Sequence, residues 1–93
     1  MFEVLLHPKA IQELRRLPPD ARARVRERLM ELAVDPLRSR PGLDVKALKS
    51  TRMPRLYRLR VGDYRAIFRV DAASGKVLVE VIYKRSQAYR GTG

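Results

Sequence analysis

Alternating apolar and polar residues predict two strands joined by a tight turn near the middle of the chain. Residues 56–61, LYRLRV, place Arg58 and Arg60 on one face of the first strand, because strand side chains alternate in direction. Residues 64–70, YRAIFRV, place Arg65 on one face of the second strand in the same way. The Gly-Asp pair between them is typical of a hairpin turn, since glycine readily adopts positive φ. Two antiparallel neighbours would bring these three guanidinium groups into one small area.

This crowding of arginines has two explanations. Like charges that face each other on a sheet repel, so the cluster is unfavourable unless an anion binds to it. The same residues would also suit the solvated outer face of an amphipathic hairpin, since charged runs are usually solvated. The hairpin alone leaves both explanations open.

The first third of the chain predicts a strand and two helices. Residues 2–6 alternate as a strand that is buried on at least one side. Pro8 suits the first turn of a helix, and apolar residues recur at helical spacing as far as Leu17. Pro18-Pro19 ends this helix, and Asp20 lies in the first turn of a second one, where its charge complements the helix dipole. The second helix carries an apolar stripe of Ala21, Val25, Leu29, Leu32 and Ala33.

The arginines of the second helix are expected to form a solvated surface. Arg24 with Glu27, and Arg28 with Glu31, make opposite-charge pairs at i,i+3. The glutamates would also repel phosphate, which disfavours an RNA-reading helix as the alternative.

The rest of the chain predicts a crossover, a loop and one more strand. Asp35-Pro36 ends the second helix, and residues 37–54 are expected to form a mostly irregular crossover. Residues 71–76 are typical of a hairpin loop. Residues 77–83 form a last strand that is apolar on both faces and therefore lies inside the sheet. The crossover is expected to reach the core through Leu43, Val45, Ala47 and Leu48.

These elements predict an α+β fold. We expect a two-helix hairpin packed on one face of a small, mainly antiparallel four-stranded sheet, in the order β-α-α-β-β-β. The 93 residues suffice for a single core, so one domain is expected over residues 1–90, with 91–93 as a loose tail.

The charge balance favours a polyanionic partner. The chain has 21 Lys and Arg against 10 Asp and Glu, a net charge of +11 on a small surface. Nucleic acid is the leading candidate, because neutralised phosphates release counterions. No apolar run approaches the roughly 18 residues of a spanning helix, and no signal peptide is recognisable, so a cytoplasmic protein is expected.

The sequence offers little for metal or thiol chemistry. Cysteine is absent, which excludes disulfides and thiol nucleophiles. His7 is the single histidine, and it is expected to cap a helix or to lie partly buried rather than to bind zinc. We therefore expect neither a metal nor another cofactor.

Two motifs resemble the RelE/ParE toxin superfamily of toxin-antitoxin systems. LYRLRVGDYRAIF at 56–68 is similar to the central hairpin of that superfamily, and YKRSQAYR at 83–90 to its C-terminal basic and aromatic motif. The resemblance implies a RelE-like toxin of a type II system, a ribosome-dependent endoribonuclease that cleaves mRNA in the A site and inhibits translation. It also implies a cognate RelB-like antitoxin and a toxin-antitoxin hetero-oligomer. The alternative is a ParE-like inhibitor of DNA gyrase, or a non-catalytic binding protein of the same fold.

The resemblance also implies the residues of the site. The catalytic positions carried over are Arg58, Arg60, Arg65, Arg85 and Tyr89. Six basic residues and no acidic one lie between positions 46 and 60, so the positive field rises toward the hairpin. The expected RNA-binding residues are Lys46, Lys49, Arg52, Arg55 and Lys84.

Cleavage in this superfamily is attack by a ribose 2′-OH on the adjacent phosphate. Arginine suits the phosphate, but its pKa above about 12 makes it a poor proton acceptor at neutral pH. The sequence therefore predicts a phosphate clamp without an assigned base, in which Tyr89 stacks on a base or orients the 2′-OH and Lys84 is a possible proton donor. The other tyrosines, Tyr57, Tyr64 and Tyr83, alternate with core positions and are expected to pack.

Overall fold

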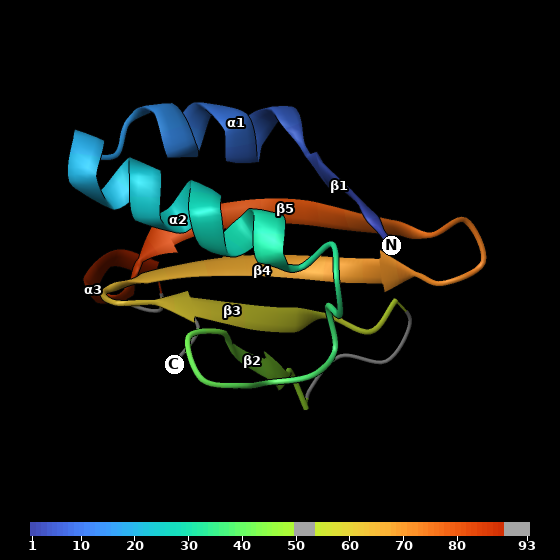
Figure 1. Ribbon diagram of the computed structural model, residues 1–93. Helices are drawn as coiled ribbons and strands as arrows, with labels where there is room; N and C mark the ends of the chain where they lie inside the picture. Colours follow the sequence, from blue (N-terminus) through green and yellow to red (C-terminus); the bar gives the residue numbers. More distant parts are fainter. Residues whose placement is uncertain (50–53, 89–93) are drawn as a thin grey trace.

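The computed structural model describes residues 1–49 and 54–88, in which two helices cover one face of a five-stranded sheet (Figure 1). The expected α+β class and helix hairpin are confirmed, and the expected tail at 91–93 lies outside the described residues. None of the described helices has the length and apolar character needed to cross a membrane. The elements are β1 (Glu3–Leu6), α1 (Pro8–Arg15), α2 (Pro19–Glu31), β2 (Asp44–Ala47), β3 (Tyr57–Val61), β4 (Tyr64–Asp71), β5 (Lys76–Lys84) and α3 (Arg85–Ala88).

The sheet is mixed and has one strand more than the four predicted. Its order is β1-β5-β4-β3-β2, with β1 parallel to β5 and the other neighbours antiparallel. The missed strand is β2, which lies inside the segment predicted to be irregular. Gly42, at φ 84°, and the bridge between Arg40 and Leu43 turn the chain into β2 at the edge of the sheet. The place of β5 between β1 and β4 confirms that the last strand is internal.

The ends of the helices follow from local sequence. Nδ1 of His7 accepts a hydrogen bond from the Lys9 amide at 3.1 Å, so His7 caps α1 as expected. The helix α2 ends at Glu31, earlier than the predicted stop at Asp35-Pro36. The Arg40 guanidinium donates to the carbonyl oxygens of Glu31 and Asp35 at 3.1 and 2.8 Å. Arg40 thereby links the last turn of α2 to the loop that follows the helix.

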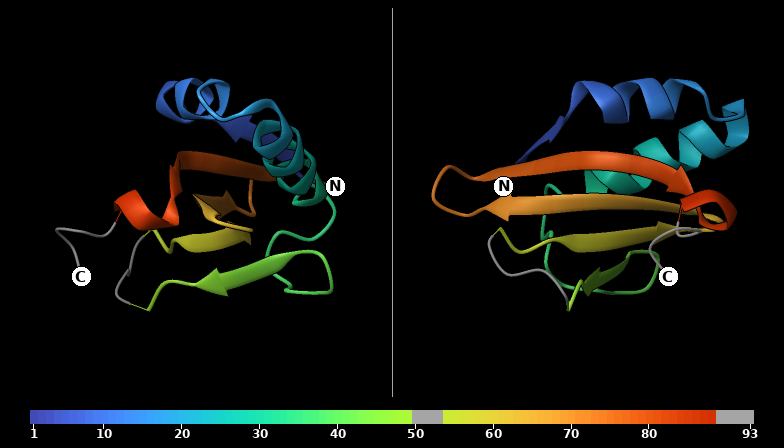
Figure 2. Two further views of the ribbon diagram at one scale, coloured as in Figure 1. Left: turned by 90° about the vertical axis from the view of Figure 1, so that its left-hand side faces the viewer. Right: turned by 180° about the vertical axis from the view of Figure 1, so that it is seen from behind.

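The core lies between the helices and one face of the sheet. Val25 and Leu29 on α2 are at most 2% exposed, and Leu59 on β3 and Phe68 on β4 are fully buried. Tyr57 stacks on Phe68 with ring centroids 5.6 Å apart, as expected for a packing tyrosine. The short helix α3 lies on the other side of the sheet (Figure 2). The two faces of the sheet therefore differ, one being the core and the other carrying the alternate, more polar residues.

A carboxylate on α1 holds this helix to the sheet. The register of β1 with β5 ends at Val79, so β5 continues without its neighbour beyond that residue. Farther along β5, the Ile82 amide donates to Oε1 of Glu13 at 2.8 Å. Glu13 thus replaces a strand as the acceptor for a partly buried backbone N–H.

We expect Glu13→Ala to lower the free energy of unfolding by about 1–3 kcal/mol, because the Ile82 amide is left without its acceptor. Urea unfolding measures the change. The matched control is Gln12→Ala, at the exposed neighbouring position, for which a change below about 0.5 kcal/mol is expected. Equal losses of stability in the two variants would show that the hydrogen bond has no specific stabilising effect.

Candidate nucleic-acid interface

The β3–β4 hairpin brings arginines together on the outer face of the sheet, away from α1 and α2. Gly62 has φ 57° in the turn, as the sequence predicts. Arg58 and Arg60 alternate with the buried Leu59, and Arg60 lies directly opposite Arg65 in the strand register. The predicted crowding of three guanidinium groups is therefore confirmed.

A groove of about 470 Å³ lies on this face, and we call it the outer groove. The strands β2, β3, β4 and β5 and the loop after β2 contribute to its wall, and α3 adds a further residue. Among the described residues, its lining contains five cations and no carboxylate. Such a lining favours a multiply charged anion. The cationic residues are Lys46, Lys49, Arg58, Arg65 and Arg85.

Arg65 is the most constrained of these cations. Its side chain is buried, with the residue only 8% exposed. Its Nη1 donates to the carbonyl oxygens of Gly62 and Tyr64 at 3.0 and 3.1 Å, which fixes the guanidinium against the hairpin turn. Burial lowers the pKa of Arg65, and the positive charges of Arg60, Arg58 and Arg85 lower the pKa further. A bound anion would relieve this electrostatic cost.

Arg58 is oriented by a contact that the sequence does not predict. Its Nη2 donates to Oδ1 of Asp44 on the neighbouring strand at 2.9 Å. Its Nε is buried and has no hydrogen-bond acceptor within residues 1–49 and 54–88. A buried donor without a partner costs about 1–3 kcal/mol, a cost that a purely structural arginine would not need to carry.

The C-terminal part of the site is joined to the hairpin through the backbone. The Arg85 amide donates to the Asp63 carbonyl at 2.7 Å, so the start of α3 is attached to the β3–β4 turn. This bond places Arg85 at the outer groove although it lies 20 or more positions after the hairpin arginines in the chain.

The remaining predicted residues lie in different places. Arg60 faces Arg65 but lines a second groove nearer α2. Lys84 is exposed in a hollow beside Asp63 and outside the lining of the outer groove. Arg55 is exposed and also lies outside that lining. Arg52 and Tyr89 fall outside the described residues.

Tyr83 is a candidate that the sequence assigns to packing. It pairs with Arg65 in the register of β4 and β5 and lines the outer groove. Tyr57 and Tyr64, by contrast, pack against the core cluster as predicted. The alternation along β5 puts Tyr83 opposite in direction to the buried Ile82, and this pattern could have separated it from the core tyrosines.

Comparison with known proteins agrees with this architecture. The family model described as the ParE toxin of type II toxin-antitoxin systems matches residues 4–89. A chain of the archaeal RelE-RelB complex from Pyrococcus horikoshii OT3 superposes with a TM-score of 0.78 and 30% identity, over 94% of this chain and 98% of that one.

Two further solved structures are similar. A chain of the RelBE2 toxin-antitoxin complex from Mycobacterium tuberculosis has a TM-score of 0.72 and 26% identity, over 90% of this chain and 98% of that one. A chain of the RelB-RelE complex from Methanococcus jannaschii has a TM-score of 0.75 and 21% identity, over 96% and 99%, and so shows the fold alone. The family match over most of the chain places this protein in the ParE toxin family of type II toxin-antitoxin systems, within the RelE/ParE superfamily.

Proposed function

We propose that this toxin is a ribosome-dependent endoribonuclease that cleaves mRNA in the A site and thereby inhibits translation in the cytoplasm. The observation that carries the proposal is the outer groove, whose described lining has five cationic residues and no carboxylate. A groove of this kind suits an RNA phosphate with its neighbouring riboses. Arg55 and Lys84, on exposed surface outside the groove, would contact RNA on either side of the cut.

The reaction is attack by a ribose 2′-oxygen on the adjacent phosphorus, with departure of the 5′-oxygen of the next nucleotide. Negative charge builds up on the phosphoryl oxygens at the transition state, and fixed guanidinium groups stabilise it without reorganising. Arg65 is fixed by the turn carbonyls and Arg58 by Asp44, so both are preorganised. Arg85 supplies a third, exposed cation from α3.

Proton transfer needs groups other than arginine. The 2′-OH must lose a proton and the leaving oxygen must gain one. The described lining of the outer groove offers Lys46, Lys49 and Tyr83, and lysine and tyrosine are both known general acids and bases. We assign to Tyr83 the first of these transfers, removal of the proton from the 2′-OH, because the strand register sets Tyr83 beside the buried Arg65.

The partner that we propose is a RelB-like antitoxin that forms a hetero-oligomer with the toxin. The similar solved structures from Pyrococcus horikoshii and Mycobacterium tuberculosis are toxin-antitoxin complexes. A net charge of +11 also favours an acidic or amphipathic partner, which would neutralise the surface and cover the outer groove.

Inhibition of DNA gyrase, without RNA cleavage, is the second candidate. It is favoured by the family model, which is that of ParE toxins, whereas the similar structures are RelE proteins. A supercoiling assay beside a cell-free translation assay discriminates the two. Breaks in mRNA at A-site codons support the endoribonuclease, and loss of supercoiling with intact mRNA supports the gyrase inhibitor.

We expect Arg85→Ala to reduce ribosome-dependent mRNA cleavage by about 100-fold, because one fixed cation at the phosphate is removed. The backbone hydrogen bond of residue 85 to Asp63 is retained, so the variant should keep the wild-type melting temperature. Primer extension on ribosome-bound mRNA measures the cleavage. Arg22→Ala, at an exposed arginine on α2, is the matched control. Equal activity of the two variants would remove Arg85 from the site.

We expect Tyr83→Phe to lower the cleavage rate at saturating ribosomes by about 100-fold, since general acid-base catalysis contributes on this scale. The KM should change little, because the ring that lines the groove is kept. Single-turnover kinetics over a range of pH measure both quantities. A rate within about threefold of wild type would transfer the proton-transfer role to Lys46 or Lys49.

A further inference from the structure

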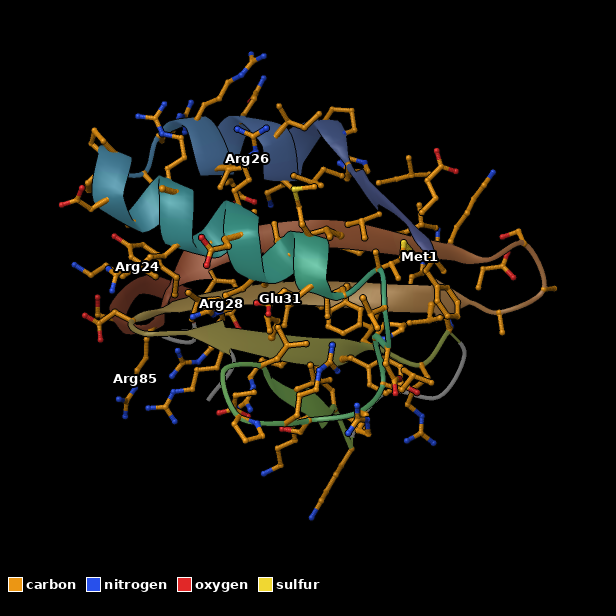
Figure 3. The ribbon with its side chains drawn as sticks, in the orientation of Figure 1. Met1, Arg24, Arg26, Arg28, Glu31 and Arg85 are labelled. Carbon is orange, nitrogen blue, oxygen red and sulfur yellow. The ribbon has the colours of Figure 1, made fainter. Side chains whose placement is uncertain are left out.

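A second cationic groove lies between α2 and the edge of the sheet formed by β2 and β3. We call it the helix groove; its volume is about 620 Å³. Four arginines line it, namely Arg24 and Arg28 on α2, Arg40 in the turn before β2, and Arg60 on β3. In Figure 3, Arg24 and Arg28 lie on the flank of α2 above β3, whereas Arg26 lies on the flank toward α1.

Two of these arginines are already committed to other contacts. Arg28 donates to Glu31 at 2.9 Å and to Glu27 at 3.2 Å. Arg40 uses Nη1 and Nη2 on three backbone carbonyls around the end of α2. These contacts hold both guanidinium groups in place, and the charge of Arg40 is not neutralised because its acceptors are neutral carbonyls.

The other two arginines have no such contacts. Within the described residues, the side chains of Arg24 and Arg60 make no hydrogen bond or ion pair. The predicted pair of Arg24 with Glu27 does not form, because Glu27 lies against Arg28 instead. Arg24 is exposed, as expected for a solvated surface, but the predicted pairing with Glu27 is wrong, whereas the predicted pair of Arg28 with Glu31 is confirmed.

Acidic residues compensate the charge of the helix groove only at Arg28, which is paired with Glu27 and Glu31. In the described part of the chain, Asp44 is the single acidic residue of its lining, and Arg58 holds the Asp44 carboxylate at 2.9 Å. Glu27 and Glu31 lie outside the lining. The groove therefore presents two unpaired guanidinium groups and that of Arg40, which binds only neutral carbonyls, beside the ion-paired Arg28.

We propose that the helix groove binds a second stretch of RNA sugar-phosphate backbone, separate from the strand that is cut. Planar guanidinium groups bind phosphate oxygens bidentately, which suits a sugar-phosphate chain that passes several arginines. Arg58 in the outer groove and Arg60 in the helix groove are two residues apart on β3, about 7 Å along the strand. The two grooves are thus lined by closely spaced residues of one strand.

This inference rests on the proposed function, in which the outer groove takes the mRNA. The helix groove would then hold structured ribosomal RNA and orient the toxin, and it would contribute to affinity rather than to bond cleavage. An acidic segment of a protein partner is the competing occupant.

The test is direct binding of the full chain to purified small ribosomal subunits across a salt titration. Two double variants that remove the same charge are compared. One combines Arg24→Gln with Arg28→Gln, and the other combines Arg22→Gln with Arg26→Gln. The first pair should weaken binding about tenfold and lower the salt slope by about 0.7–0.9 for each phosphate that is no longer neutralised. The second pair should change the affinity by less than about threefold, because it removes only a diffuse field.

Equal weakening by the two pairs, or no weakening by either, would overturn the groove as a site. The single variant Arg24→Gln breaks no contact within the described residues, so it serves if the double variant unfolds. A poly-glutamate peptide is run in parallel. If the variants at Arg24 and Arg28 fail to bind the peptide but retain the ribosomal subunits, the RNA assignment is wrong. In a further outcome, the wild type fails to cleave mRNA while the double variant at Arg24 and Arg28 still binds ribosomal subunits more weakly than the control. This outcome would refute the proposed function but support the helix groove as an RNA-binding site.

Discussion

The charged face of the sheet depends on the buried guanidinium of Arg65. This side chain donates to two carbonyl oxygens of the β3–β4 turn and so fixes both its own position and the shape of the turn. The strand register then forces Arg60 to lie opposite it, and the Asp63 carbonyl in the same turn receives the Arg85 amide. Backbone pairing across three strands supplies the free energy that holds these like charges together, and their repulsion is the cost. An anion at this face would lower the energy of a structure that is already assembled.

Much of the fold is predictable because its signals are local. Alternation in 56–70 and a glycine with positive φ define the central hairpin, and two prolines define the break between the helices. The strand β2 was not predictable with the same ease, since four residues at a sheet edge carry a short pattern and depend on pairing with β3. The parallel pairing of β1 with β5 likewise depends on tertiary contacts, and no local sequence pattern encodes it.

The residues of the candidate site are likewise predictable only where their signals are local. The sequence identifies the hairpin arginines and Arg85, because charge and alternation are visible along the chain, and the outer groove brings most of them together. Asp44 and Tyr83 were missed, since each acquires its place through a cross-strand neighbour, Arg58 for the first and Arg65 for the second. The two adjacent grooves could not be foreseen either. They exist because β3 has one groove on its outer face and another at its end beneath α2.

The pairing of β1 with β5 has a consequence for the synthesis of the protein. Leu6 and Val79 lie side by side in the sheet although 73 positions separate them in the chain. Chains grow from the N-terminus, so β1 cannot join the sheet before β5 has been made. Until then β4 has only β3 as a neighbour. The core stays open and Arg85 is absent until the segment from Lys76 to Arg85 has been synthesised. A nascent chain of this protein therefore carries no assembled charged face until β5 and Arg85 have been synthesised.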